Sequence, residues 1–285
     1  MSKPLITLYI PGTREDMILK SAKYEPDAII IDLEDTVPMD LKAETRTRIA
    51  DLIPQLSLQP IIRINNEPDL IQDDLKAVAS DKINSILVPM AEDLDALKEA
   101  DRVVTKIEIE QGYEPDSIKF ILMMESVLGV MRCYDLATSV KRVESVAFGS
   151  AEDGDLQREM GCGFSVEGTE MLYARSKVLL EARAAKLPYV LDGAFSAVKD
   201  LDALRADCTL SRRLGYDGRT LIHPSQIPVA REAYSLPKEE LAHYRKVAEE
   251  FEVAEANGLA AVQVNGKLID YAMYKQAKAV LARSE

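Results

Sequence analysis

Histidine and cysteine are scarce in this sequence of 285 residues. The two histidines, His223 and His243, are too few for a histidine-rich zinc site. The three cysteines, Cys133, Cys162 and Cys208, lie far apart, with no CxxC or other metal-binding spacing. Free cysteines without a disulfide pattern are typical of a reduced, cytosolic environment.

Basic residues and long apolar runs are also limited. Lys and Arg number 35 against 48 Asp and Glu, so the net charge is −13 and the sequence pI about 4.8. An acidic chain is poorly suited to bind nucleic acid or an anionic membrane. The most apolar run, Phe120–Met131, includes Glu125 and is shorter than the ~20 residues that a bilayer requires. The apolar stretch near the N-terminus stops at Pro11-Gly12, too early for a signal peptide. We expect a cytoplasmic protein.

Short β-branched runs alternate with longer amphipathic stretches along most of the chain. Eight apolar strands, each followed by a helix, predict a parallel sheet covered on both faces. The clearest helical patterns are Leu41–Leu56, Leu94–Ile109, Met171–Lys186 and Leu201–Leu214. The predicted strands are Ile6–Ile10, Ala28–Asp32, Pro60–Asn65, Ser85–Pro89, Ile118–Glu125, Val143–Gly149, Tyr189–Gly193 and Thr220–His223.

An open doubly wound sheet and a closed barrel both fit this alternation. Eight repeats in about 235 residues match the usual size of a (β/α)8 barrel, ~250 residues. No G-x-G-x-x-G follows the first strand, which weakens the dinucleotide-binding alternative. We therefore predict an α/β fold, a (β/α)8 TIM barrel, over residues 1–236.

The pattern changes in residues 237–285. Lys238–Asn257 reads as one long charged helix, and a second helix covers about Tyr271–Arg283. Between them, Val262–Ile269 alternates around Asn265-Gly266, a strong signal for a β-hairpin. This helix–hairpin–helix segment is too small for a core of its own, so we expect it to pack on the barrel or on a neighbouring subunit as a lid or oligomerisation segment.

Polar residues follow or interrupt most of the later strands, where a barrel enzyme keeps its reacting groups. Any single residue of this kind, such as Asp35 or Asp153, is more often a helix cap than a catalytic group. Several on one edge of a barrel are harder to explain in that way. The set consists of Asp32, Glu34 and Asp35 after strand two, Arg63 and Asn65 in strand three, Glu125, Asp153, Asp192 and His223.

Two features of this set predict chemistry. Arg63 lies inside an apolar strand, so it requires a buried anionic partner or a ligand. Carboxylates from two strands form an all-oxygen site suited to Mg²⁺, and Glu125 and Asp153 are the candidate ligands. An arginine beside them would bind a substrate carboxylate in a bidentate fork.

These residues stand in motifs that resemble the citrate lyase beta-subunit and malyl-CoA lyase family of magnesium-dependent C–C lyases. Seven motifs occur in order over essentially the whole chain, and together they are specific. They are Leu8-Tyr9-Ile10-Pro11-Gly12 (family L-F-V-P-G), Asp32-Leu33-Glu34-Asp35 (D-L-E-D), Arg63-Ile64-Asn65 (R-x-N), Met124-Glu125-Ser126 (M-x-E-T), Phe148–Asp153 (F-G-x-x-D), Gly215–Gln226 (G-F-D-G-K, then I-H-P-x-Q) and Gly266–Asp270 (G-x-x-I-D).

The resemblance implies Mg²⁺ on Glu125 and Asp153, and a substrate contact from Arg63. It further implies that Lys20 and Arg14 contact CoA phosphates, although Lys20 also reads as an ordinary solvated helix lysine. Glu34 and Asp35, in the D-L-E-D motif, are further candidates for substrate binding.

The resemblance also implies that Asp270, on the C-terminal lid, acts as acid/base, often in a neighbouring protomer of a homotrimer or hexamer. A cap for the final helix is the alternative for Asp270, and both roles are compatible. Two departures affect the substrate more than the reaction class: Leu5 replaces a family arginine, and Ser126 a threonine.

The implied activity is Mg²⁺-dependent cleavage of a 3-hydroxyacyl-CoA, of the citramalyl-CoA or malyl-CoA type, to acetyl-CoA and a 2-oxoacid. Three alternatives stay open. The chain could be a citrate lyase beta subunit that cleaves citryl-acyl carrier protein to oxaloacetate, or a non-catalytic barrel that acts as a binding or scaffold subunit. A metal-dependent aldolase with a histidine base is disfavoured, because no histidine precedes His223.

Overall fold

The computed structural model describes residues 5–284. The chain divides into two compact units, with the division between Glu232 and Ala233. Within the described residues, no helix combines the length and the apolar character needed to span a membrane. Each unit is described by itself below.

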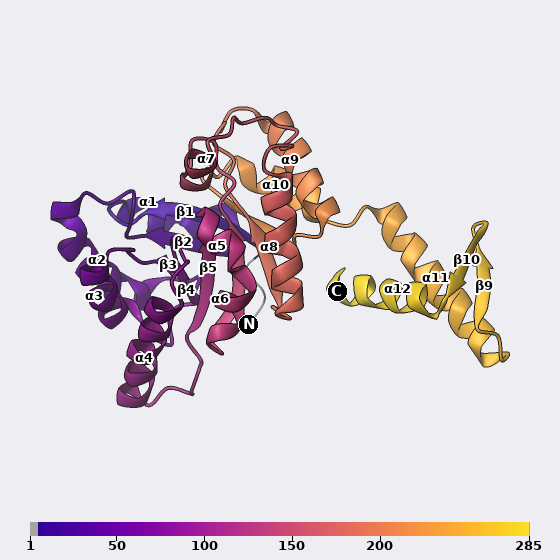
Figure 1. The fold of residues 1–285 in the computed structure, drawn as a ribbon, viewed down its shortest axis with the longest axis horizontal. Helices are drawn as coiled ribbons and strands as arrows, with labels where there is room; N and C mark the ends of the chain where they lie inside the picture. The colour runs from indigo at the N-terminus through magenta and orange to yellow at the C-terminus, as the bar shows by residue number, and fades with distance from the viewer. Residues whose placement is uncertain (1–4, 285) are drawn as a thin grey trace. The chain divides into compact units, whose positions relative to one another are not determined.

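Eight parallel strands close into a barrel in the N-terminal unit, in sequence order (Figure 1). Each strand pairs with the next, and β8 pairs with β1 to complete the cylinder. This architecture confirms the predicted (β/α)8 barrel. The strands are β1 (Ile6–Pro11), β2 (Ala28–Asp32), β3 (Ile61–Arg63), β4 (Ser85–Val88), β5 (Lys119–Met124), β6 (Val143–Phe148), β7 (Tyr189–Asp192) and β8 (Gly218–Leu221).

Helices connect the strands, and Figure 1 shows α2, α3 and α4 on the outside of the sheet. The four helices with the clearest sequence patterns appear as α2, α4, α8 and α9, with ends shifted by a few residues at most. The helices of this part of the chain are α1 (Glu15–Lys20), α2 (Lys42–Leu52), α3 (Pro68–Val78), α4 (Leu94–Gln111), α5 (Val127–Met131), α6 (Cys133–Ser139), α7 (Asp155–Met160), α8 (Leu172–Ala184), α9 (Leu201–Leu214) and α10 (Gln226–Tyr234).

Alternate residues of the strands fill the barrel interior with apolar side chains. The cluster includes Ile30 of β2, Ile61 of β3 and Leu87 of β4, each at most 1% exposed. Because side chains alternate between the two faces of a strand, the residue two positions later points to the same side. This alternation places Asp32 and Arg63 at the carboxyl end of the interior, above the apolar cluster.

The last barrel strand begins and ends two residues earlier than the sequence pattern indicates. The apolar pattern predicts Thr220–His223, whereas β8 covers Gly218–Leu221. Gly218 is unfavourable in strands, but here a Cβ would lie only 2.0 Å from the Leu5 carbonyl oxygen, so β1 approaches too closely for any side chain. The strand ends early because Gln226 Oε1 accepts hydrogen bonds from the amides of Ile222 (3.1 Å) and His223 (3.2 Å), which turns the chain.

The C-terminal unit has the predicted helix–hairpin–helix order, α11 (Lys238–Ala256), β9 (Ala261–Val264), β10 (Lys267–Asp270) and α12 (Tyr271–Ser284). Asn265 and Gly266 both have positive φ, 50° and 78°, as a two-residue hairpin turn requires. A small apolar cluster holds the hairpin on the helices; it consists of Val247, Phe251, Val264, Ile269 and Ala277.

Candidate active site

A cavity of about 300 Å³ lies at the carboxyl end of the barrel, and we call it the central cavity. The carboxyl ends of parallel barrel strands meet there, so side chains far apart in the sequence come together. Its polar lining includes Asp32 at the end of β2, Arg63 of β3, Glu125 directly after β5 and Thr220 of β8.

Arg63 has the buried anionic partner that its position in an apolar strand predicts. Its Nε donates to Asp32 Oδ1 (2.7 Å) and its Nη2 to Asp32 Oδ2 (2.8 Å), in a bidentate pair. The remaining nitrogen, Nη1, lies 3.0 Å from Glu34 Oε2 and 3.2 Å from Asp35 Oδ2. The guanidinium thus joins the acid that ends strand β2 and the two that follow it.

The sequence analysis includes Asp32 among the polar residues at the strand ends but gives it no role of its own, and the structure shows it as the main partner of Arg63. Its carboxylate also accepts hydrogen bonds from the Glu34 amide (2.9 Å) and from the amide (3.1 Å) and hydroxyl (2.6 Å) of Thr36. Burial alone would raise the pKa of Asp32, but the hydrogen bonds from Arg63 and Thr36 outweigh it and lower the pKa. Asp32 is therefore a fixed anion that orients Arg63.

Glu34 and Asp35 differ sharply in environment. The Glu34 side chain is 12% exposed and that of Asp35 67%. Burial raises the pKa of Glu34 to about 8, against the opposing influence of Arg63. Glu34 therefore carries a proton at neutral pH and can donate a hydrogen bond, while Asp35 lines the mouth of the cavity as an exposed carboxylate.

Glu125 is only 7% exposed and lies directly after β5. Its Oε1 accepts a hydrogen bond from the Met90 amide (2.9 Å). Burial raises the pKa of Glu125 to about 7, and the charge of Asp155 adds to the rise. Glycine at position 149 makes this placement possible, because a Cβ there would lie 2.5 Å from the Cβ of Glu125.

The acidic loop after β6 presents Asp155 to the central cavity. Asp155 is the first residue of α7, lines the cavity and pairs with Arg158. Asp153 is exposed and does not line the cavity. Its backbone is left-handed, with φ 59°, and its amide donates to Gln157 Oε1 (2.6 Å). The structure thus brings Glu125 together with Asp155 and not with Asp153.

The donor set of the central cavity fits Mg²⁺. Glu125 and Asp155 supply two carboxylates, and Mg²⁺ typically takes one or two protein carboxylates together with waters and substrate oxygens. Burial is the main cause of the raised pKa of Glu125, and the negative charge of Asp155 adds to the rise, so a bound cation would stabilise both carboxylates in their charged form. Among the described residues, no group of three or more His, Cys, Asp or Glu side chains could hold a metal by itself.

Three other polar residues from the strand ends have structural partners outside the cavity lining. Asn65 donates from its amide and side chain to Asp74 (2.8 and 2.6 Å). Asp192 is fully buried and pairs with Arg175 (2.6 Å). His223 is exposed and contacts Ser225 (2.8 Å). They stabilise the barrel wall and its turns.

The two residues implied as CoA contacts lie near α1. Arg14 precedes the helix and forms an exposed ion pair with Asp16 (3.3 Å), and Lys20 is exposed at the last helical position. Asp270 belongs to the C-terminal unit, where its Oδ1 accepts from the amides of Ala272 (2.9 Å) and Met273 (3.0 Å) and so caps α12. The cap uses one carboxylate oxygen and leaves the other for a further role.

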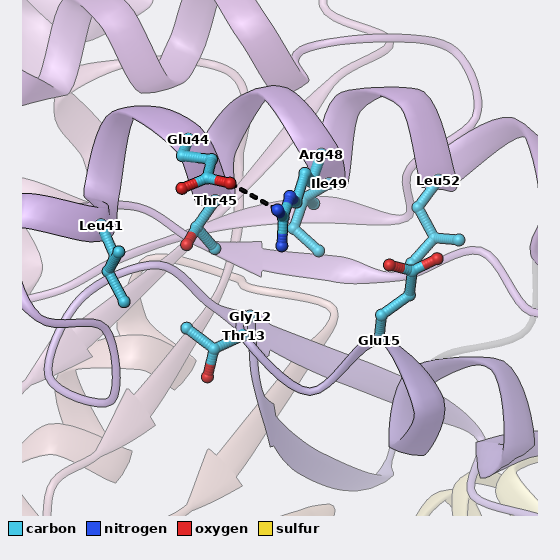
Figure 2. A pocket seen from close by; sticks show the side chains of 9 residues that line it. All are labelled: Gly12, Thr13, Glu15, Leu41, Glu44, Thr45, Arg48, Ile49 and Leu52. Atoms are coloured by element: carbon cyan, nitrogen blue, oxygen red, sulfur yellow. Dashed lines mark hydrogen bonds and ion pairs between the residues drawn. The ribbon is translucent and has the colours of Figure 1, made fainter.

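Figure 2 shows a second pocket, of about 210 Å³, outside the barrel between the start of α1 and helix α2. Its lining includes Gly12, Thr13 and Thr45, and its charged pair Glu44 and Arg48 is joined by an ion pair. Gly12 is required there, because a Cβ would lie 2.7 Å from the Asp32 carbonyl oxygen and 2.9 Å from Thr45 Cγ2. The family-like Pro-Gly step thus lets the loop after β1 pack closely on β2 and α2.

Comparison with known proteins identifies the family. Residues 5–224 match the HpcH/HpaI aldolase/citrate lyase family. The chain belongs to this family. Its members are carbon–carbon lyases, and the reaction class of this enzyme follows from that membership.

Full-length relatives support the assignment. The citrate lyase subunit beta of Haemophilus influenzae is 30% identical, covering 98% of this chain and 96% of the relative. A (3S)-malyl-CoA thioesterase of Cereibacter sphaeroides is 31% identical, covering 98% and 93%. The solved citrate lyase beta subunit of Mycobacterium tuberculosis, complexed with oxaloacetate and magnesium, is 25% identical with a TM-score of 0.61, covering 80% of this chain and 95% of that one.

Proposed function

We propose that this enzyme is a Mg²⁺-dependent lyase that cleaves a 3-hydroxyacyl-CoA, of the malyl-CoA or citramalyl-CoA type, to acetyl-CoA and a 2-oxoacid. The observation that carries the proposal is that Glu125, Asp155 and Arg63 line one cavity at the carboxyl end of the barrel. Relatives named for citrate lyase and malyl-CoA chemistry, and a relative solved with oxaloacetate and magnesium, support this substrate class.

Glu125 and Asp155 would hold the Mg²⁺. Asp155 takes the role that the sequence pattern assigns to Asp153, because Asp155 lines the cavity beside Glu125 while Asp153 lies outside its lining. A bound Mg²⁺ supplies Lewis-acid polarisation of the hydroxyl and carboxylate oxygens of the substrate.

Arg63 provides the positive charge for the substrate carboxylate and for the enolate that forms when the C–C bond breaks. Asp32 holds two of its nitrogens, so only Nη1 is directed toward exposed groups. A substrate anion can replace the exposed Asp35 carboxylate at Nη1 without disturbing the buried pair. The protonated Glu34 beside it can donate to a substrate oxygen.

In this proposal Asp270 of a neighbouring protomer protonates the enolate carbon when that protomer's C-terminal segment closes over the cavity. Exclusion of water then protects the enolate from solvent. Arg14 and Lys20 are exposed cations on the loop and helix after β1, suited to the phosphates of CoA. The trimeric or hexameric assembly stays a prediction.

The test is release of 2-oxoacid from malyl-CoA and citramalyl-CoA, with Mg²⁺ and with EDTA. We expect turnover only with Mg²⁺ and a loss of about 100-fold or more in Glu125→Gln, because the metal contributes several kcal/mol to the transition state. Release of free hydroxy acid without 2-oxoacid would show thioester hydrolysis instead. Turnover in EDTA would refute the metal assignment.

A citrate lyase beta subunit is the second candidate, favoured by the 30% identity to the Haemophilus influenzae protein over 98% of this chain. That enzyme would require the thioester arm on a carrier protein. Oxaloacetate release from citryl-acyl carrier protein, together with no turnover of free CoA thioesters, would favour this alternative.

A further inference from the structure

Tyr9 lies at the floor of the central cavity. Its ring packs against the apolar cluster that fills the barrel interior, as does Met123, and both residues line the cavity. The guanidinium carbon of Arg63 lies 5.3 Å from the centre of the Tyr9 ring. Tyr9 therefore separates the apolar interior from the charged residues of the site.

The Tyr9 hydroxyl has only a weak acceptor. It donates to Met123 Sδ at 3.6 Å, and a thioether sulfur is a poor hydrogen-bond acceptor. Tyr9 is half-buried and lines the cavity, so a ligand in the cavity can offer its hydroxyl a stronger acceptor than the thioether. Burial, opposed by Arg63, raises the pKa of Tyr9 well above its ordinary value, so the phenol stays neutral and keeps its proton to donate.

The position of this hydroxyl decides which part of a substrate it meets. The long thioester arm of CoA has to leave through the open mouth of the barrel, so the opposite end of the molecule lies deepest. In the reaction proposed above, that end is the 2-oxoacid half with its carboxylate. Arg63, the cation suited to this carboxylate, lies directly over the Tyr9 ring.

We propose that the Tyr9 hydroxyl donates a hydrogen bond to a carboxylate oxygen of the 2-oxoacid half, beside the Arg63 guanidinium. This inference rests on the proposed function for the identity of the ligand. In the L-F-V-P-G motif that this segment resembles, phenylalanine stands at the position of Tyr9. The hydroxyl makes Tyr9 a residue that selects for a carboxylate at the cavity floor.

Tyr9→Phe tests the proposal, because it removes the hydroxyl and keeps the ring under Arg63. Pyruvate and acetyl-CoA are titrated separately into the wild type and the variant by calorimetry, with saturating Mg²⁺, and each variant's Tm is checked first. We expect Kd for pyruvate to rise about tenfold, as for loss of a hydrogen bond to a charged group. Kd for acetyl-CoA should stay within about twofold.

Tyr189→Phe is the matched control. Tyr189 is a second tyrosine of the barrel interior, at the start of β7, and its hydroxyl donates to Glu144 (2.9 Å) instead of lining the cavity. Its loss should leave Kd for pyruvate unchanged.

Four results would each overturn the role of Tyr9. Two concern Tyr9→Phe itself: pyruvate binding that stays unchanged, or acetyl-CoA binding that weakens as much as pyruvate binding. The other two are a Tyr189→Phe variant that weakens pyruvate binding as much as Tyr9→Phe does, and a wild type that does not bind pyruvate. The titration does not depend on turnover. Pyruvate binding that weakens as expected, in an enzyme that cleaves no CoA thioester, would support Tyr9 and refute the proposed reaction.

Discussion

Replacing Asp32 by Asn should strongly destabilise the barrel, whereas the same change at Asp35 should not. Both carboxylates contact the Arg63 guanidinium, at 2.7 and 2.8 Å from Asp32 and 3.2 Å from Asp35. They differ in burial, since the Asp32 side chain is 1% exposed and that of Asp35 67%. The two variants therefore compare a buried bidentate ion pair with an exposed single contact to the same guanidinium.

The expected magnitudes follow from that difference. Breaking a buried ion pair costs about 3–5 kcal/mol, because the remaining charge stays buried without its partner. Asparagine keeps one acceptor oxygen for the guanidinium, so we expect about 3 kcal/mol for Asp32→Asn, or roughly 6–12 °C in Tm. An exposed pair contributes at most about 1 kcal/mol, so Asp35→Asn should lower Tm by no more than about 4 °C.

Thermal unfolding followed by far-ultraviolet circular dichroism is the suitable assay, because the chain contains no tryptophan for fluorescence. It is run at neutral pH, where Asp32 is charged; the lowered pKa of Asp32 means that its contribution is present above the ordinary carboxyl pKa and is lost on acidification below it. Equal loss of Tm in the two variants would refute the argument that burial decides the strength of the pair.

Three further predictions follow from the site. Asp155→Asn should weaken Mg²⁺ binding about tenfold or more in calorimetry while Asp153→Asn leaves it unchanged, and the reverse result would restore Asp153 as the ligand. Because the pKa of Glu34 is raised from 4.5 to about 8, the native state keeps a proton that the unfolded chain releases; in EDTA the unfolding free energy should fall between pH 4.5 and 8, and Glu34→Gln should make this fall smaller, the rest coming from Glu125, whose pKa is raised to about 7. Asp270→Asn should lower kcat about 100-fold while asparagine still caps α12, so wild-type turnover in the variant would argue against its acid/base role.

Local patterns predicted the fold well because they record which residues must be buried. The continuous apolar strands and their helices gave rise to the barrel prediction, and the Asn265-Gly266 turn located the hairpin within a residue or two. The pattern erred at β8, where Gly218 joins the strand because β1 approaches closely from elsewhere in the chain. The local sequence around Gly218 contains no information about a strand that packs against it from a distant part of the chain.

For the candidate active site, too, some features could be predicted from the sequence and others could not. The sequence alone determined that an arginine in an apolar strand needs a buried anion, and that acids gather at the ends of barrel strands. Only the tertiary structure decided that Asp32 is that anion, that Asp155 and not Asp153 lines the cavity with Glu125, and that Asp192 pairs with Arg175. The reason is physical: spacing along the chain fixes which strand carries a side chain, whereas loop geometry and the closure of the barrel fix which charges come within contact.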